Sequence, residues 1–137
     1  MSAHAQLVEE LGRRFRAGDW DGAFALFHAD FRIQQPESLP HGGWHVGAEG
    51  MRTMAETFGR YWDRSIDDPA VTGCEDLVVQ ITTQTWTAKA TGRSATVDVV
   101  ELFAFADDLI AQIRVFQQDT HLLMGTLDDG PRDGSAG

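Results

Sequence analysis

The sequence predicts an α+β fold, because two hydrophobic periodicities follow one another along its 137 residues. Within the first 63 residues, apolar side chains recur every three or four positions, and after residue 65 they recur every second position. Helices followed by neighbouring strands are typical of helices packed on one face of an antiparallel sheet. We expect one domain over residues 1–127 and a flexible C-terminal tail over residues 128–137, which is almost free of apolar residues.

The first two helices are predicted on either side of a break. The apolar stripe of a helix over residues 2–17 consists of Leu7, Leu11 and Phe15. Gly18 is suited to end this helix, and Asp19 is suited to cap the next one with its carboxylate. The second helix is expected over residues 20–28, with His28 at its C-terminal end, where the helix dipole favours a cation.

A short strand, a loop and a long helix follow. Residues 30–35 are predicted to form a strand that ends at Pro36, because proline cannot donate a hydrogen bond to a sheet. Two prolines and a Gly-Gly pair exclude a helix over residues 36–46. A helix over residues 47–63 carries an apolar stripe made of Met51, Met54, Ala55, Phe58, Tyr61 and Trp62.

Four long strands are predicted in the rest of the chain. Valine, threonine and aromatic residues, which favour strands, are frequent there. Turns that contain glycine or aspartate separate strands over residues 66–74, 76–88, 95–106 and 109–118.

The charge of the chain disfavours polyanionic partners. Its 21 acidic and 11 basic residues give a formal net charge of −10 at pH 7. Such a field repels nucleic acid and anionic membrane surfaces, and the apolar runs are too short to span a bilayer. Cys74 is the only cysteine, and the N-terminus lacks the pattern of a secretory signal. We therefore expect no intrachain disulfide and a cytoplasmic location.

Three stretches of the sequence resemble one family. RFRAGDWDGAFALFHADFRIQQP is similar to the opening of ketosteroid isomerases and SnoaL-like polyketide cyclases. ESLPHGGWHVGAEGM resembles a segment common among SnoaL-like members, and VVELFAFADDLIAQIRVFQQDTHLL resembles their final hairpin. The resemblance extends over about residues 7–127 and implies the fold of the nuclear-transport-factor-2-like superfamily. In this cone-shaped, cystatin-like α+β barrel, three N-terminal helices pack on a curved, mainly antiparallel sheet.

The resemblance also implies roles for four positions. The isomerases place a general-base aspartate just before the proline that ends their first strand, and this position is Gln35. Their phenolic hydrogen-bond donor corresponds to Leu11, and their second, protonated acid corresponds to Glu101. The catalytic aspartate that cyclases and epoxide hydrolases place on the last strand corresponds to Val115. Each layout is therefore incomplete, which disfavours steroid isomerisation of the usual kind.

Glu101 is the most informative candidate catalytic residue, because it lies on an otherwise apolar strand face. Burial there raises the pKa of a carboxyl group and suits it to proton transfer near neutral pH. Two hairpin registers remain open. A two-residue turn at residues 107–108 places Glu101 opposite Arg114 as an ordinary cross-strand pair, whereas a three-residue turn places it opposite Val115 as a lone acid in a pocket. The second register keeps the apolar faces together, and neither turn residue is the glycine that tight turns favour.

The loop over residues 36–46 holds two further candidates. Pro36 and Pro40 bracket Glu37 and His41, and a carboxylate that orients an imidazole can move a proton. The alternative is a solvent-facing loop in which Glu37 caps backbone N–H groups.

A metal site is suggested by the spacing of four between Glu37, His41, His45 and Glu49. Such spacing converges ligands only on a helix, which the prolines and glycines of this loop exclude. We therefore expect no metal and no other cofactor.

The strand over residues 76–88 decides the character of the expected pocket. Its even-numbered face carries Gln80, Thr82 and Gln84 between apolar residues. If this face lines the cone, the pocket is amphipathic and suits an oxygenated aromatic ligand; if it faces outward, it forms an exposed or dimeric surface. The expected substrate-binding residues are Trp20, Phe58, Trp62, Gln84, Trp86, Phe103, Val115 and Gln117.

These patterns predict a cofactor-free enzyme that transfers protons on a hydrophobic, oxygenated, polyketide- or steroid-like substrate, by isomerisation, aldol-type cyclisation or dehydration. Glu101 would exchange a proton with the reacting carbonyl system, and Glu37 or His41 would handle the second proton. Gln35 would donate a hydrogen bond to the substrate. One alternative is a non-catalytic small-molecule binder or dimeric interaction module, with Glu101 paired to Arg114 and the cone filled by side chains. A third is an epoxide hydrolase. We also expect a homodimer through the outer face of the sheet.

Overall fold

Four helices and six strands are present in the computed structural model, which describes residues 2–128 apart from the side chain of Asp68. In chain order they are α1 (Ala3–Arg16), α2 (Trp20–Phe24), β1 (Phe27–Gln35), β2 (Gly43–Val46), α3 (Gly47–Tyr61), β3 (Trp62–Gly73), β4 (Val78–Ala88), β5 (Ser94–Ala106), β6 (Leu109–Gln117) and α4 (Thr120–Gly125).

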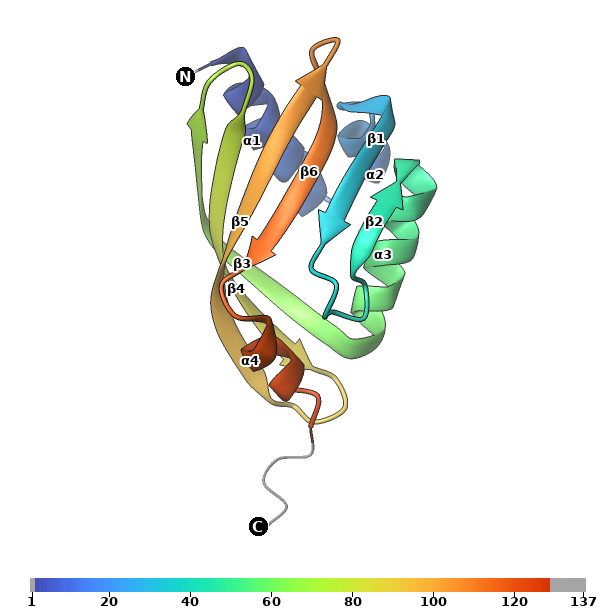
Figure 1. Cartoon of the computed structure of the whole chain (residues 1–137), viewed down its shortest axis with the longest axis vertical. Helices are drawn as coiled ribbons and strands as arrows, with labels where there is room; N and C mark the ends of the chain where they lie inside the picture. The colour runs from blue at the N-terminus through green and yellow to red at the C-terminus, as the bar shows by residue number, and fades with distance from the viewer. Residues whose placement is uncertain (1, 129–137) are drawn as a thin grey trace.

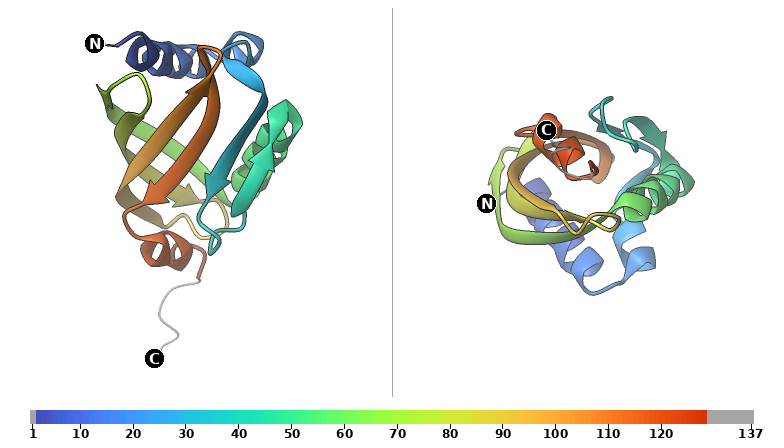
Figure 2. Two further views of the ribbon diagram at one scale, coloured as in Figure 1. Left: turned by 45° about the horizontal axis from the view of Figure 1, so that its top comes forward. Right: turned by 90° about the horizontal axis from the view of Figure 1, so that it is seen from below.

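The strands form one curved sheet in the order β2-β1-β6-β5-β4-β3 (Figure 1). Only β1 and β6 run parallel; the other neighbouring strands are antiparallel. Because β2 and β3 remain edge strands, the sheet curls without closing, as the view from below shows (Figure 2). This arrangement confirms the predicted α+β cone with a mainly antiparallel sheet.

The helices cover the sheet at both ends of the cone. Helix α1 contacts β3 and β4, α3 contacts β1 and β2, and α4 contacts β5 at the end where the chain leaves the sheet (Figure 1). The buried apolar core joins both layers, with Val8 and Leu11 from α1, Met51 from α3, and Phe103 and Ile113 from the sheet.

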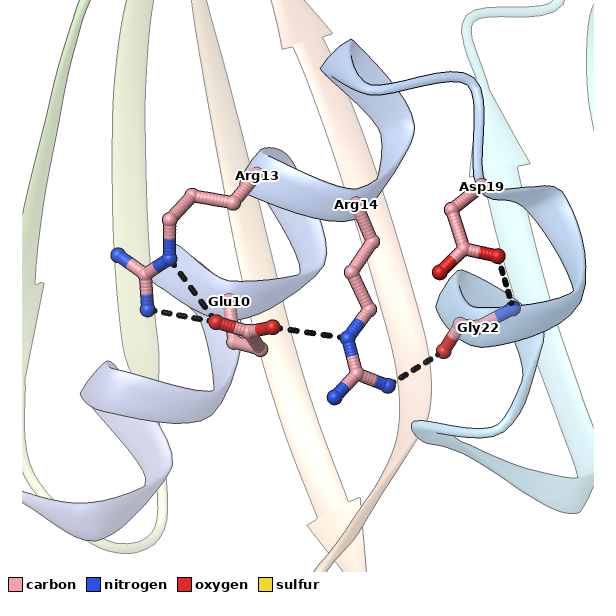
Figure 3. Close-up of polar contacts among 5 residues, drawn as sticks. All are labelled: Glu10, Arg13, Arg14, Asp19 and Gly22. Atoms are coloured by element: carbon pink, nitrogen blue, oxygen red, sulfur yellow. Dashed lines mark hydrogen bonds and ion pairs between the residues drawn. The ribbon is translucent and has the colours of Figure 1, made fainter.

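The break between α1 and α2 follows the prediction. Gly18 has a positive φ of 75°, a conformation that glycine adopts without strain. The Asp19 carboxylate accepts a hydrogen bond of 2.9 Å from the Gly22 N–H and so caps α2 (Figure 3). Arg14, which is paired with Glu10 on α1, donates to the Gly22 carbonyl at 2.7 Å and ties the two helices together.

The second helix is shorter than predicted. It ends at Phe24, and β1 begins at Phe27, which is buried opposite Ile110 of β6. His28 therefore lies on a strand and not at a helix end, and its Nε2 is 3.2 Å from the Asp107 carboxylate. Pairing with β6 overrides the local helical pattern, because it buries Phe27 and satisfies backbone groups at the same time.

Two other boundaries also differ from the prediction. Helix α3 ends at Tyr61, and Trp62 already begins β3 with its indole N–H 2.8 Å from the Thr126 hydroxyl. The expected loop contains the short strand β2, which pairs Gly43 with Gln35 of β1. A helical stripe and a strand face both bury Trp62, so periodicity could not distinguish them.

The tail predicted over residues 128–137 lies, apart from Asp128, outside the described residues. No helix in the described part of the chain is long and apolar enough to cross a membrane.

Candidate functional site

A cavity of about 380 Å³ lies between the sheet and the helices α1 and α3. Its size is typical of small-molecule sites. Apolar side chains from both helices form one wall: Val8, Leu11, Phe15, Met51, Met54 and Phe58. The sheet contributes the polar groups: Gln35, Arg64, Gln80, Thr82, Gln84 and Glu101.

Glu101 is the only acidic residue among the described residues that line this cavity. It lies in β5 between Gln80 of β4 and Val115 of β6. The amide of Gln80 donates to its carboxylate at 2.7 Å. Burial raises the pKa of Glu101, although the hydrogen bond from Gln80 and the charge of Arg64 act in the opposite direction. The carboxyl group is thus poised to exchange a proton closer to neutral pH.

The β5–β6 hairpin has the second of the two predicted registers, in which Glu101 lies opposite Val115. Its turn, however, is not the three-residue turn expected for that register. Asp107 and Asp108 have positive φ angles of 53° and 59°, the signature of a tight two-residue turn. A β-bulge follows, because Phe105 pairs with Ile110 while Ala104 pairs with Gln112. The unpaired Ala111 shifts the register by one residue. Turn and bulge together therefore give the pairing that a three-residue turn would give.

The alternative pair of Glu101 with Arg114 does not form. Arg114 lies opposite Leu102, on the other face of the sheet. Its guanidinium donates to Gln34 at 3.4 Å and lies over the ring of Phe116. Glu101 is left without a cross-strand ion pair in the described structure.

His41 lines the same cavity from the loop after β1. Its side chain is buried against the rings of Phe58, Trp62 and Trp86. Burial, with smaller contributions from Arg64 and His45, lowers the pKa of His41 to about 4. The imidazole is therefore neutral near pH 7, and its buried Nδ1 has no hydrogen-bond partner among the described residues.

Two tight turns in the loop hold His41 inward. Leu39 donates its backbone N–H to the Pro36 carbonyl at 3.1 Å, and Gly42 donates to the Leu39 carbonyl at 2.9 Å. A Cβ atom at Gly42 would lie 2.4 Å from the Pro36 carbonyl oxygen, so only glycine fits this close approach. Glu37, in contrast, is exposed and does not line the cavity. The predicted Glu37–His41 pair is wrong, because the turns direct the two side chains to different environments.

A chain of side-chain hydrogen bonds fixes the polar face of β4. The indole N–H of Trp86 donates to Gln84 at 2.9 Å, and the amide of Gln84 donates to the Thr82 hydroxyl at 3.0 Å. All three residues are buried, and Gln84 and Thr82 line the cavity. The even-numbered face of this strand therefore points inward, and the pocket is amphipathic.

Gln35 provides a second amide in the cavity. Its Nε2 lies 3.5 Å from the sulfur of Met54, and its Oε1 accepts from Gln117 at 3.4 Å. The thioether of Met54 is a weak acceptor, and the contact with Gln117 is at the long end of hydrogen-bonding distances, so the amide is weakly held and available to a ligand.

Four of the eight predicted substrate-binding residues line the cavity, and four do not. Trp20, Phe58, Gln84 and Phe103 line the cavity as expected. The other predicted binding residues are not part of the lining and support it from behind: Trp62, Trp86, Val115 and Gln117. Indole groups make hydrogen bonds within the core, which takes them out of reach of a ligand.

Arg64 is the main residue that sequence reasoning missed. It lies in β3 opposite Trp86, and its guanidinium carbon is 4.9 Å from the centre of the Phe58 ring. Its charge acts on both Glu101 and His41. The signal was the alternation of Trp62, Arg64 and Ile66 on one strand face. It was missed because the helix was predicted to extend to residue 63 and the strand to begin only at residue 66.

We predicted no metal site at Glu37, His41, His45 and Glu49, although these residues are spaced four apart. In the described residues, no group of three or more histidine, cysteine, aspartate or glutamate side chains is arranged to hold a metal ion. His45 instead has its Nε2 2.8 Å from the backbone carbonyl of His41.

The chain also matches a known protein family. The model of the SnoaL-like domain matches residues 8–113. The chain belongs to the SnoaL-like family. A comparison with curated proteins finds no match.

Solved structures share the fold of this SnoaL-like protein. It is similar to an NTF2-like protein from Burkholderia thailandensis E264, with a TM-score of 0.84 and 19% identity over 93% of this chain and 99% of that one. An NTF2-like protein from Burkholderia xenovorans LB400 gives a TM-score of 0.81 and 21% identity over 91% and 95% of the two chains. TerC, co-crystallised with polyporic acid, gives 0.80 and 19% over 90% and 97%.

The family positions converge in this SnoaL-like protein. The sequence resemblance matches Leu11, Gln35 and Glu101 to the three functional positions of ketosteroid isomerases, and all three line the cavity of about 380 Å³. Of these, only Glu101 is ionisable. Val115 is buried opposite Glu101 and does not line the cavity, so no acid faces Glu101 from the last strand.

Proposed function

We propose that this SnoaL-like protein is a cofactor-free enzyme that transfers protons on a hydrophobic, oxygenated, polyketide- or steroid-like substrate. The observation that carries the proposal is a lone carboxyl group, Glu101, in an amphipathic cavity open to a ligand. A buried carboxyl with a raised pKa is a general acid or base matched to neutral pH. The reaction is an isomerisation, an aldol-type cyclisation or a dehydration.

In this mechanism, Glu101 takes a proton from the carbon beside the substrate carbonyl and returns it at another position. The negative charge that develops on the substrate oxygen is stabilised by the nearby guanidinium of Arg64 and by the amide N–H groups of Gln35. Gln80 holds the carboxylate of Glu101 in one orientation through its 2.7 Å hydrogen bond. A dehydration or an aldol-type cyclisation also requires a proton on the oxygen that leaves or that accepts the new bond, and neutral His41, with its unpaired Nδ1, is the candidate to exchange this proton.

Relatives of known fold support an enzyme of this type. A Pseudomonas putida KT2440 protein described as a candidate polyketide cyclase gives a TM-score of 0.75 at 16% identity, over 93% of this chain and 99% of that one. The rival non-catalytic module requires Glu101 to pair with Arg114 and side chains to fill the cone. Neither feature is present in the described residues.

The test is Glu101→Gln, which keeps the shape of the side chain and removes its ability to exchange a proton. Deuterium incorporation from solvent into a panel of bicyclic and polycyclic ketones, followed by proton NMR, reports α-proton transfer without knowledge of the natural substrate. We expect a loss of at least about 100-fold in the exchange rate, as is typical for removal of a general base.

Glu56→Gln on the exposed face of α3 is the matched control and should leave the exchange rate unchanged. Equal rates for wild type and Glu101→Gln would remove Glu101 from the mechanism. Ligand binding by the wild type with no exchange across the panel would favour the non-catalytic binder.

We propose further that the chain acts as a homodimer in the cytoplasm. The free, exposed Cys74 suits a reducing compartment. An apolar row crosses the outer face of the sheet, where Ile81, Val100 and Phe116 are paired neighbours on β4, β5 and β6. Ile81 and Phe116 are each 43% exposed, and a second copy of the chain would cover them.

A further inference from the structure

The cavity contains a positive charge that the chain itself does not neutralise. The molecule carries 21 acidic residues. Three arginines on its helices form ion pairs with acidic side chains: Arg13 and Arg14 with Glu10, and Arg52 with Asp21. Arg64 and Arg16, which both line the cavity, have no ion pair among the described residues. Glu101 is the one acid among the described residues of the cavity lining, so two arginines against one carboxyl group leave a net positive charge there. In such an acidic protein this excess of positive charge points to an anionic ligand.

Arg64 is placed to bind an acid group. Its guanidinium carbon lies 4.9 Å from the centre of the Phe58 ring, and its N–H groups have no hydrogen-bond partner among the described residues. Burial lowers the pKa of Arg64, but arginine remains charged at any physiological pH. Arg64 is exposed and also lines the cavity, so its guanidinium is accessible to a ligand. A planar guanidinium binds a carboxylate through two parallel, charge-assisted hydrogen bonds.

Arg16 places a second positive charge where a smaller hollow adjoins the cavity. A smaller hollow of about 90 Å³ adjoins the main cavity and shares Gly12, Arg16, Pro69 and Gln80 with it. A Cβ atom at Gly12 would lie 3.0 Å from a guanidinium nitrogen of Arg16, so Arg16 lies against the helix at this junction. The glycine makes room for the cation.

From this geometry we propose that the substrate of this protein is an organic acid, and that Arg64 binds its carboxylate or acidic enol oxygen while the apolar body fills the cavity. The inference deepens the proposed function, on which it rests for the identity of the site. The expected substrate is then an anionic aromatic or polyketide-like acid and not a neutral steroid. Arg64 is then the residue that determines specificity for charge.

A pair of probes with one shape and two charges tests the proposal. 2-Naphthoate and 2-naphthamide differ only in the acid group, and isothermal titration calorimetry at pH 8 measures their dissociation constants. For the wild type we expect naphthoate to bind at least about ten-fold more tightly, as one charge-assisted contact commonly provides. In Arg64→Gln this preference should disappear, whereas Arg64→Lys should retain part of it.

Arg60→Gln is the matched control, because it removes one exposed positive charge from α3 outside the cavity and should retain the full preference. Equal affinities of the two probes for the wild type would overturn the proposal, and so would an undiminished preference in Arg64→Gln. Circular dichroism establishes that each variant is folded. Should Arg64→Gln fail to fold, the comparison of Arg64→Lys with the wild type still decides, because an unchanged preference there would contradict bidentate binding.

The Glu101→Gln variant separates this inference from the proposed function. It should bind naphthoate at least as tightly as the wild type, since a competing negative charge is removed. Weaker naphthoate binding in Glu101→Gln would overturn the assignment, because Glu101 would then be the group that holds the acid. Retained proton exchange in Glu101→Gln with an Arg64-dependent preference would refute the proposed mechanism and leave the anionic ligand standing.

Discussion

Four ionisable side chains of the described residues line the cavity, namely Arg16, His41, Arg64 and Glu101, and the charge of Arg64 acts on both His41 and Glu101. Burial favours the neutral forms of Glu101 and His41, because a charge loses its hydration in an apolar site. The cation of Arg64 stabilises the Glu101 carboxylate and further disfavours protonation of His41. At neutral pH the cavity therefore holds two permanent positive charges, one neutral imidazole and one acid that is able to change its state.

The lowered pKa of His41 predicts a pH-dependent stability. The pKa is about 4 in the folded protein and about 6.5 in an unfolded chain, so the unfolded state binds the extra proton between these values. The free energy of unfolding should therefore fall as the pH drops from 6.5 to 4, by at most about 3 kcal/mol from this residue. Urea denaturation at pH 7, 5.5 and 4 measures it.

His41→Phe isolates this contribution, because the apolar ring keeps the aromatic contacts and cannot bind a proton. The difference in unfolding free energy between wild type and His41→Phe should shrink or reverse toward pH 4. His121→Gln, at an exposed position on α4, should run parallel to the wild type. A His41→Phe profile parallel to the wild type would show that His41 is not buried in its neutral form.

At the scale of elements, the β5–β6 hairpin determines what Glu101 faces. Its two-residue turn places both Asp107 and Asp108 at positive φ, where a side chain is strained and glycine is not. The bulge at Ala111 then brings Glu101 opposite Val115. A local irregularity of one residue thus separates a pocket acid from a surface ion pair.

Asp108→Gly should stabilise the protein, because it removes the strain at φ 59°. The expected gain in unfolding free energy is about 0.5–1 kcal/mol, measured by urea denaturation. Asp76→Gly is the matched control, since Asp76 lies in an exposed turn without a positive φ and glycine there only increases the entropy of the unfolded chain. Equal effects of the two substitutions would argue against strain in the hairpin.

At the scale of the whole molecule, the curved sheet has two faces with different uses. The concave face and the helices enclose the cavity, while the outer face presents the row of Ile81, Val100 and Phe116. An apolar row across three central strands is costly to leave in water, which is the basis of the proposed homodimer.

Analytical ultracentrifugation tests the dimer directly. The wild type should sediment at twice the chain mass, and Phe116→Glu should shift it toward the monomer by burying a charge in the interface. Leu122→Glu, at an apolar residue of α4 that is 47% exposed, should leave the mass unchanged. A monomeric wild type at micromolar concentrations would refute the proposal.

The sequence by itself determined the class of fold and the acid that lines the cavity, Glu101. Side-chain periodicity identifies which face of a helix or strand is apolar, and burial of that face forces the helices onto the sheet. The same reasoning singled out Glu101, because an acid on an apolar strand face must be either paired or functional. It also gave the break at Gly18 and Asp19, where local backbone chemistry decides the outcome.

Only the tertiary structure decided which candidates meet. Glu37 and His41 are neighbours in one loop, yet tight turns bury one and expose the other. Arg64 of β3 meets Glu101 of β5 and His41 of the loop after β1 at one cavity, and this meeting depends on the curvature of the sheet. The bulge at Ala111 is set by packing across the hairpin and not by its own side chain. Contacts between distant segments arise from the collective packing of the chain, which no local pattern encodes.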